Sequence, residues 1–126
     1  MRKFFWIGLS VATLLVLPSA QARNPGVSAE RCVSMQRQGN KGIFKNNCGE
    51  KAFIIWCGDL TYSKKRCGDG PKGGYYTHSA NIPAGKSHTV SGLKGRVNWG
   101  ACKGGIGFGH AEYSDTRSGG YVCKKR

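Results

Sequence analysis

The sequence predicts an all-β protein, a small disulfide-braced β-sandwich or partly open barrel with glycine-rich loops. Three observations lead to this prediction. Glycine accounts for 20 of the 126 residues, most of them from Gly68 onward, and each glycine inside a helix costs about 1 kcal/mol relative to alanine. The clearly periodic segments are short and strand-like. Six cysteines in so short a chain are typical of a disulfide framework.

Two segments give the clearest strand signals. Residues 51–57 form an apolar run rich in β-branched and aromatic side chains, which predicts a strand buried on both faces. Residues 96–101 alternate instead, so that one face is apolar and the other polar. We expect the apolar face to lie in the core. The two faces carry Val97, Trp99 and Ala101 on one side and Arg96 and Asn98 on the other.

Near the N-terminal end of the predicted domain, the sequence indicates a β-hairpin. Residues 32–37 and 42–45 flank Gly39-Asn40, a dipeptide suited to a tight turn because both residues tolerate positive φ. A short helix starting at Ser28 is the alternative for the first of these segments.

Further along the chain the signals are weaker. Residues 82–86 predict a turn with Gly85 in the left-handed region, followed by a strand at residues 88–90. A last short strand is expected at residues 119–123. Residues 58–79 show no clear pattern.

The first 22 residues have the order of a cleavable signal peptide. Arg2 and Lys3 precede an uncharged stretch at residues 4–17, and Ala20-Gln21-Ala22 provides the small residues of a cleavage site. A membrane anchor is the alternative, but it requires about 20 apolar residues. We therefore expect a secreted or periplasmic protein without a transmembrane anchor, in which residues 23–126 form a single, monomeric domain.

All six cysteines follow the predicted signal peptide. Their shortest spacing, nine residues from Cys48 to Cys57, is unlike the close pairs of a zinc site, so we expect three disulfide bonds. The sequence alone does not choose among the possible pairings. The favoured set closes a short loop, ties two strands together and pins the termini: Cys57–Cys67, Cys48–Cys102 and Cys32–Cys123.

The charge of the chain indicates an anionic partner. The formal charge is +14, and it falls to +12 when Arg2 and Lys3 are removed with the signal peptide. Such an excess favours nucleic acid, lipopolysaccharide, acidic glycans, anionic lipid head groups or acidic proteins, although net charge also serves solubility.

Two basic clusters stand out, and tyrosines lie near the first of them. Their cations could neutralise phosphate or sulfate, and the rings could stack on bases or sugars. A solvated loop and a frayed tail are the alternative interpretation of the two clusters. The candidate binding residues are Lys64, Lys65, Arg66, Tyr75, Tyr76, Lys124, Lys125 and Arg126, with Tyr62 beside the first cluster.

Catalytic signatures are weak. Two glycine-containing segments, residues 85–87 and 105–109, imitate nucleotide-binding loops but lack required glycines. If the chain is extended at His110 and Glu112, both side chains share a face, and the carboxylate could orient the imidazole for acid/base chemistry. Such a pair is more often a surface pair. No cofactor and no metal site are predicted. The remaining acid/base candidates are His78, His88 and Asp115.

These observations give one leading hypothesis and two alternatives. The leading hypothesis is an exported, basic, non-enzymatic protein that binds an anionic macromolecule or cell surface. The first alternative is an inhibitor or effector that docks on a specific protein target, with charge steering the encounter. The second is a small secreted ribonuclease-like enzyme that uses His110 and Glu112.

Overall fold

The computed structural model describes residues 25–106 and 112–125, so the predicted signal peptide lies outside the described residues. Within these ranges the chain forms eight strands and one short 3-10 helix, and the predicted all-β class is confirmed. The elements are β1 (Val33–Gln38), β2 (Lys41–Asn46), β3 (Ala52–Leu60), η1 (Pro71–Gly73), β4 (His78–Ile82), β5 (Ser87–Val90), β6 (Leu93–Lys103), β7 (Tyr113–Asp115) and β8 (Tyr121–Cys123).

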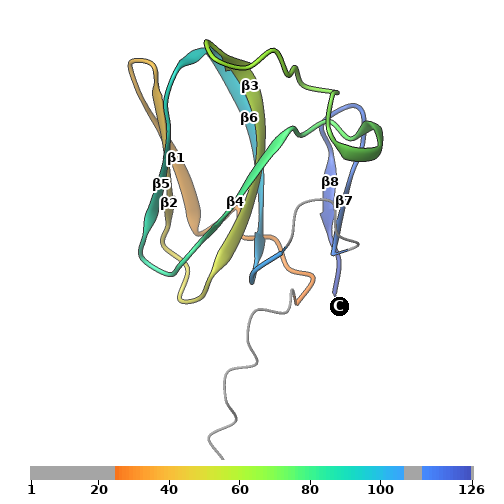
Figure 1. The fold of residues 1–126 in the computed structure, drawn as a ribbon. Helices are drawn as coiled ribbons and strands as arrows, with labels where there is room; N and C mark the ends of the chain where they lie inside the picture. The colour runs from red at the N-terminus through yellow and green to blue at the C-terminus, as the bar shows by residue number, and fades with distance from the viewer. Residues whose placement is uncertain (1–24, 107–111, 126) are drawn as a thin grey trace, which may run out of the picture.

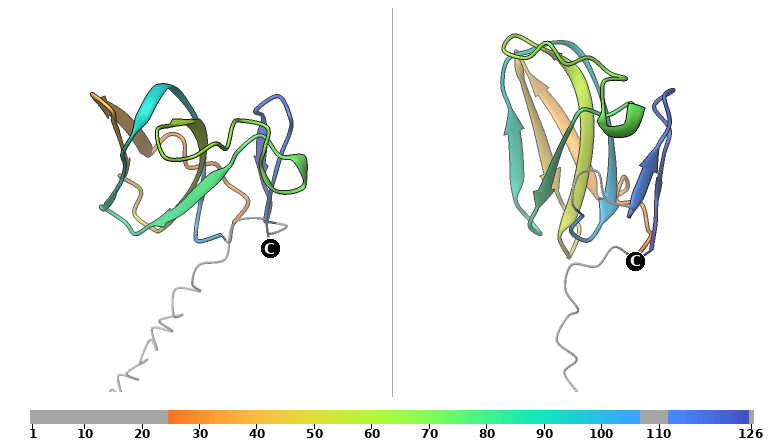
Figure 2. Two further views of the ribbon diagram at one scale, coloured as in Figure 1. Left: turned by 45° about the horizontal axis from the view of Figure 1, so that its top comes forward. Right: turned by 45° about the vertical axis from the view of Figure 1, so that its right-hand side comes forward.

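The strands form three layers. Two three-stranded antiparallel sheets have the orders β1-β2-β5 and β4-β3-β6, and β7 pairs with β8 as a separate hairpin. The sheet β4-β3-β6 is the middle layer, with β1-β2-β5 on one side and the β7–β8 hairpin on the other (Figures 1 and 2). The two larger sheets are not joined into a closed barrel, so the structure is an open sandwich.

The middle layer explains the uninterrupted apolar run of β3. Ile54 and Trp56 face the sheet β1-β2-β5 and belong to the core between the two sheets. Phe53 and Ile55 face the hairpin and belong to a second core. Because both faces of β3 are covered, its side chains from Ala52 to Cys57 are all buried, and the prediction of a strand buried on both faces is confirmed.

The alternation predicted for residues 96–101 is also confirmed within β6. Val97, Trp99 and Ala101 pack in the core between the two larger sheets. On the opposite face, Gly100 lies under the ring of Tyr121 from β8. A Cβ atom at position 100 would come within 2.5 Å of that ring, so glycine allows β8 to approach the middle sheet.

The predicted hairpin of residues 32–37 and 42–45 corresponds to β1 and β2, and the alternative of a helix from Ser28 is wrong. Gln38 pairs with Lys41, which leaves a two-residue turn. Gly39 has a φ of 59°, whereas Asn40 does not have positive φ. The turn therefore has the dihedral pattern of a type II′ turn, with positive φ at its first central residue only.

The later strands agree in part with the sequence. The turn at residues 82–86 is present, with Gly85 at a φ of 73° and a hydrogen bond from the Lys86 amide to the Pro83 carbonyl. It leads into β5 as expected, and β8 lies within the last predicted strand. The strands β4 and β7 were not predicted, and β4 begins inside the stretch that showed no pattern.

Of the three predicted disulfide bonds, Cys57–Cys67 is confirmed and the other two are wrong. The observed bonds are Cys32–Cys48 and Cys102–Cys123. Cys32 and Cys48 flank the hairpin β1–β2, whose antiparallel pairing brings these positions together. Cys102 could not reach Cys48, because Cys102 lies in the second core, facing the hairpin, whereas Cys48 lies in the core between the two larger sheets.

Candidate functional site

The first basic cluster lies on the connection between β3 and β4, residues 61–77. This connection runs across one end of the two sheets and reaches the turn of the β7–β8 hairpin (Figure 1). The Cys57–Cys67 bond anchors it to β3. Internal hydrogen bonds fold it back on itself: the Gly68 amide donates to the Tyr75 carbonyl at 2.8 Å and the Gly70 amide to the Gly74 carbonyl at 2.9 Å. Most of the segment without a sequence pattern, residues 61–77, is therefore an ordered loop.

Lys64, Lys65 and Arg66 are exposed on this loop. Arg66 lies 3.5 Å from a carboxylate oxygen of Asp59, and both side chains are about 60 % exposed (59 % and 61 %). An ion pair so exposed contributes little stability and leaves Arg66 available. Within residues 25–106 and 112–125 it is the only ion pair, so Lys64 and Lys65 have no carboxylate partner there.

Nearby carboxylates are occupied by backbone amides instead of by cations. Asp69 accepts a hydrogen bond from the Arg66 amide at 2.9 Å. Asp115, on β7, accepts one from the Tyr76 amide at 3.0 Å. These two contacts hold the loop in shape and hold it against the hairpin, which explains why acidic residues are present on this basic end of the molecule.

Two further cations, Lys72 and Arg117, join the loop. Lys72 is exposed in η1 with a left-handed φ of 55°. The guanidinium of Arg117, from the turn between β7 and β8, lies 3.3 Å from the position that a Cβ atom on Gly73 would occupy. We call Lys64, Lys65, Arg66, Lys72 and Arg117 the basic loop surface.

Sequence reasoning did not find Lys72 or Arg117. Neither residue belongs to a basic run, and they are brought together only when the hairpin packs against the loop. Lys72 is also a non-glycine residue with positive φ, which is uncommon.

The tyrosines near this surface have different environments. Tyr62 is 67 % exposed and lies over Gly92, where a Cβ atom would come within 2.9 Å of its ring. Tyr75 is half-buried, with its ring against Gly119. Tyr76 is only 3 % exposed and its hydroxyl donates to the Gly119 carbonyl at 2.6 Å.

Tyr76 is therefore a core residue and is not available for stacking on a ligand, contrary to the role considered from the sequence. Burial, together with nearby tyrosines and carboxylates, raises the pKa of Tyr76 to about 12. Its phenol thus remains protonated and keeps its hydrogen bond at neutral pH. Tyr62 and Tyr75 are the rings that a ligand on this end of the molecule could contact.

The second basic cluster lies at the other end of the hairpin. Lys124 and Lys125 follow β8, where the Lys124 amide donates to the Glu112 carbonyl and Pro25 forms a bridge with Lys125. The turn that carries Arg117 is at the opposite end of the hairpin (Figure 1). The two clusters predicted from the sequence therefore do not form one site. Arg126 lies outside the described residues.

The proposed catalytic pair stays a prediction. His110 lies outside the described residues. Glu112, immediately before β7, is 7 % exposed.

The other two histidines lie among aromatic side chains between the two larger sheets. His78 stacks on Trp56, with ring centroids 4.3 Å apart, and His88 pairs with Phe44 across β5 and β2. Burial lowers the pKa of both histidines, and the charge of Lys65 lowers the pKa of His78 further. Nε2 of His78 is buried and makes no hydrogen bond within the described part of the chain.

These histidines should make the fold sensitive to mild acid. Their pKa values are lower in the folded state than the unfolded value of about 6.5, so the unfolded chain binds more protons and the free energy of unfolding falls as pH falls below neutrality. We expect a lower guanidinium midpoint at pH 5.5 than at pH 7.5. The double variant H78N/H88N should show a flatter profile over this window, which lies above the range where carboxylates titrate. A midpoint that rises on acidification would contradict this explanation.

The described residues contain no helix long and apolar enough to cross a membrane. The chain matches no protein family model, and no curated protein or solved structure shows a significant similarity to it.

Proposed function

We propose that this protein is an exported, non-enzymatic binding protein that engages an anionic polymer through the basic loop surface. One observation carries the proposal: five cations from two distant parts of the chain lie on the β3–β4 connection and on the hairpin turn packed against it, where carboxylates are either occupied by backbone amides or form a single exposed ion pair. Cations placed in this way are free to neutralise phosphate or sulfate groups.

The aromatic side chains at this end support a polymer as the ligand. The ring of Tyr62 is largely exposed and that of Tyr75 is partly exposed. Exposed rings beside cations stack on bases or on sugar faces with little sequence preference. Nucleic acid, lipopolysaccharide and acidic glycans all combine repeated negative charge with bases or sugar rings on which a tyrosine can stack. Export, which the predicted signal peptide favours, agrees with the three disulfide bonds, since such bonds persist in oxidising compartments.

Two variants that remove the same charge test the proposal. We expect K64Q/K65Q/R66Q to weaken binding of a labelled single-stranded RNA by about 10- to 100-fold at 50 mM salt, because three phosphate contacts are lost. K124Q/K125Q/R126Q removes the three cations of the second basic cluster, of which Lys124 and Lys125 lie at the other end of the hairpin, and should have a much smaller effect. The measurement is fluorescence anisotropy on the oxidised proteins, repeated with double-stranded DNA, lipopolysaccharide and a sulfated glycan.

The outcomes separate the hypotheses. Equal losses in the two variants would mean that net charge, and not the basic loop surface, governs binding. Undiminished binding by K64Q/K65Q/R66Q would overturn the proposal. The RNA is recovered after each titration and its length checked, because cleavage that is lost in His110→Ala would support the ribonuclease-like alternative instead.

A further inference from the structure

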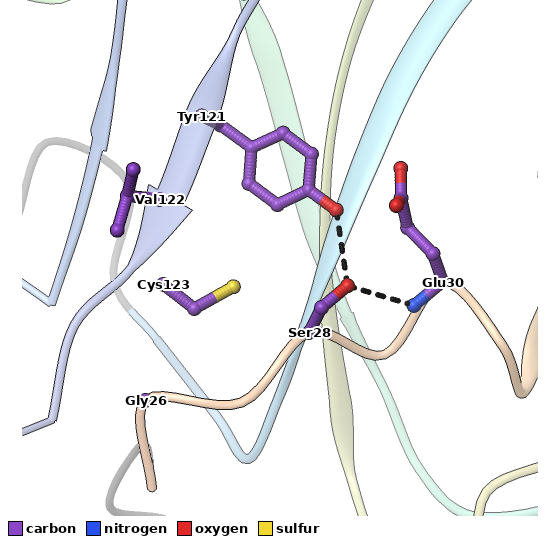
Figure 3. Close-up of a pocket in the computed structure, with 6 residues that line it drawn as sticks. All are labelled: Gly26, Ser28, Glu30, Tyr121, Val122 and Cys123. Carbon is purple, nitrogen blue, oxygen red and sulfur yellow. Dashed lines mark hydrogen bonds between the residues drawn. The ribbon is translucent and has the colours of Figure 1, made fainter.

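A groove of about 310 Å³ lies between the N-terminal segment and β8 (Figure 3). This volume is at the lower end of the range of small-molecule sites, about 300–1,000 Å³. No residue of the basic loop surface lines the groove. Its lining residues are Gly26, Ser28, Glu30, Tyr121, Val122 and Cys123.

The polar atoms of the groove are two hydroxyls and a carboxylate. The hydroxyls of Ser28 and Tyr121 hydrogen-bond to each other at 3.3 Å, and they lie 3.5 and 3.3 Å from the Ala101 carbonyl. Ser28 Oγ also accepts the Glu30 amide at 3.2 Å. A hydroxyl can donate or accept, whereas the ionised carboxylate of Glu30 can only accept. A ligand that contacts Glu30 must therefore donate a hydrogen bond.

The charge of Glu30 favours a positively charged donor. Glu30 is exposed and forms no ion pair in the described part of the chain, although the sequence has 20 lysines and arginines against 6 acidic residues. Figure 3 shows its carboxylate on the same side of the groove as the Tyr121 hydroxyl. An ammonium group beside a carboxylate forms a charge-assisted hydrogen bond, which is about twice as strong as a neutral one.

Tyr121 is held in place and stays neutral. Its ring lies on Gly100, where a Cβ atom would clash with it. Burial raises the pKa of Tyr121, and the charge of Glu30 adds to this increase. The phenol therefore keeps its proton at neutral pH.

An apolar wall completes the groove. The ring of Tyr121 and the side chain of Cys123, which is bonded to Cys102, lie on the same side of β8 as Ser28, whereas the Val122 side chain lies on the other side of the strand (Figure 3). Apolar surface next to acceptors suits the C–H face of a hydroxylated ring. We propose that this groove binds an amino sugar, or a hydroxylated ring of similar size that carries a protonated amine. The inference depends on the groove alone and does not rest on the proposed polymer binding.

Glucosamine and glucose form the test pair, since they share a ring and differ in the amine. Titrations of the ¹⁵N-labelled protein are followed by NMR at 0.15 M salt, where a Debye length of about 8 Å screens repulsion from distant cations. We expect glucosamine to shift the backbone amides of Ser28, Glu30 and Val122 saturably, with a Kd of millimolar order, and glucose to bind about 5-fold more weakly.

Two glutamate variants make the test specific. Glu30→Gln keeps the shape of the side chain and should reduce glucosamine binding to the level of glucose. Glu50→Gln, the matched control, removes an exposed carboxylate that does not line the groove and should change nothing.

Absence of saturable shifts at the groove residues, or equal effects of the two glutamate variants, would overturn the inference. Because K64Q/K65Q/R66Q leaves the groove intact, it should bind glucosamine like the unmodified protein. The proposal for the groove and the proposal for the basic loop surface can therefore be contradicted independently of each other.

Discussion

Replacing Phe44 with alanine is expected to lower the free energy of unfolding by about 3–5 kcal/mol, the usual cost of removing a buried phenylalanine. Phe44 is fully buried on β2. Its ring lies 5.8 Å from that of Trp99 and 6.4 Å from that of Trp56, so it joins the sheet β1-β2-β5 to the middle sheet. The surrounding strands are fixed by ladder hydrogen bonds and cannot collapse fully into the cavity.

The adjacent residue provides the control. Ile43 points to the outer face of the same strand and is half-buried, so Ile43→Ala should cost about 1 kcal/mol. Guanidinium titrations with all disulfides intact give both values from midpoint and slope. Similar losses at the two positions would mean that β2 does not present alternate faces to core and solvent, and the sandwich described here would be wrong.

The sequence predicted those strands in which the order of apolar and polar residues alone shows which faces are buried. The apolar run of β3 reflects burial of both faces of that strand, and the alternation of Val97, Trp99 and Ala101 in β6 reflects burial of one face, because a strand directs successive side chains to opposite sides. The type of residue at the hairpin turn was also informative, since Gly39 occupies a positive-φ position.

Strands held by specific polar contacts were missed. On β4, Asn81 faces the hairpin side of the middle sheet. Asparagine is typical of loops, yet the Asn81 side chain donates to the Ile106 carbonyl at 2.9 Å and accepts from the Ile106 amide at 3.0 Å. Such a residue fits a strand only when its partner is known. The strand β7 is three residues long, too short for a periodic pattern.

The disulfide errors have a related cause. The short spacing in the sequence was sufficient to predict the Cys57–Cys67 bond, because this bond closes a loop within a single connection between strands. The pairing of Cys102 with Cys123 required knowing which face of β6 Cys102 occupies and that the last hairpin, which carries Cys123, covers that face. A shift of one residue along β6 would have placed Cys102 on the opposite face of the strand, on the side of the core that contains Cys48.

The candidate site was predicted only where charges are consecutive. Lys64, Lys65 and Arg66 form a run that is visible in the sequence, whereas Lys72 and Arg117 meet only through tertiary packing. The neighbouring residues Tyr75 and Tyr76 are equally apolar in the sequence, but the Asp115 carboxylate fixes the backbone so that Tyr76 enters the core.

The salt dependence of polymer binding is the second large effect that we expect. Each phosphate neutralised on a single strand contributes about 0.7 to the slope of log affinity against log salt concentration. If all five cations of the basic loop surface engage the polymer, the slope is about −3.5. Affinity should then fall by about 100-fold between 50 and 200 mM salt.

Measuring this slope for the oxidised protein and for K64Q/K65Q/R66Q on the same single-stranded RNA tests the central claim most directly. We expect a slope of about −3.5 for the unmodified protein and a value smaller in magnitude by about 2 for the variant, because three of the five contacts are removed. A slope near zero for the unmodified protein, or the same slope for both proteins, would contradict the assignment of the basic loop surface as the binding site.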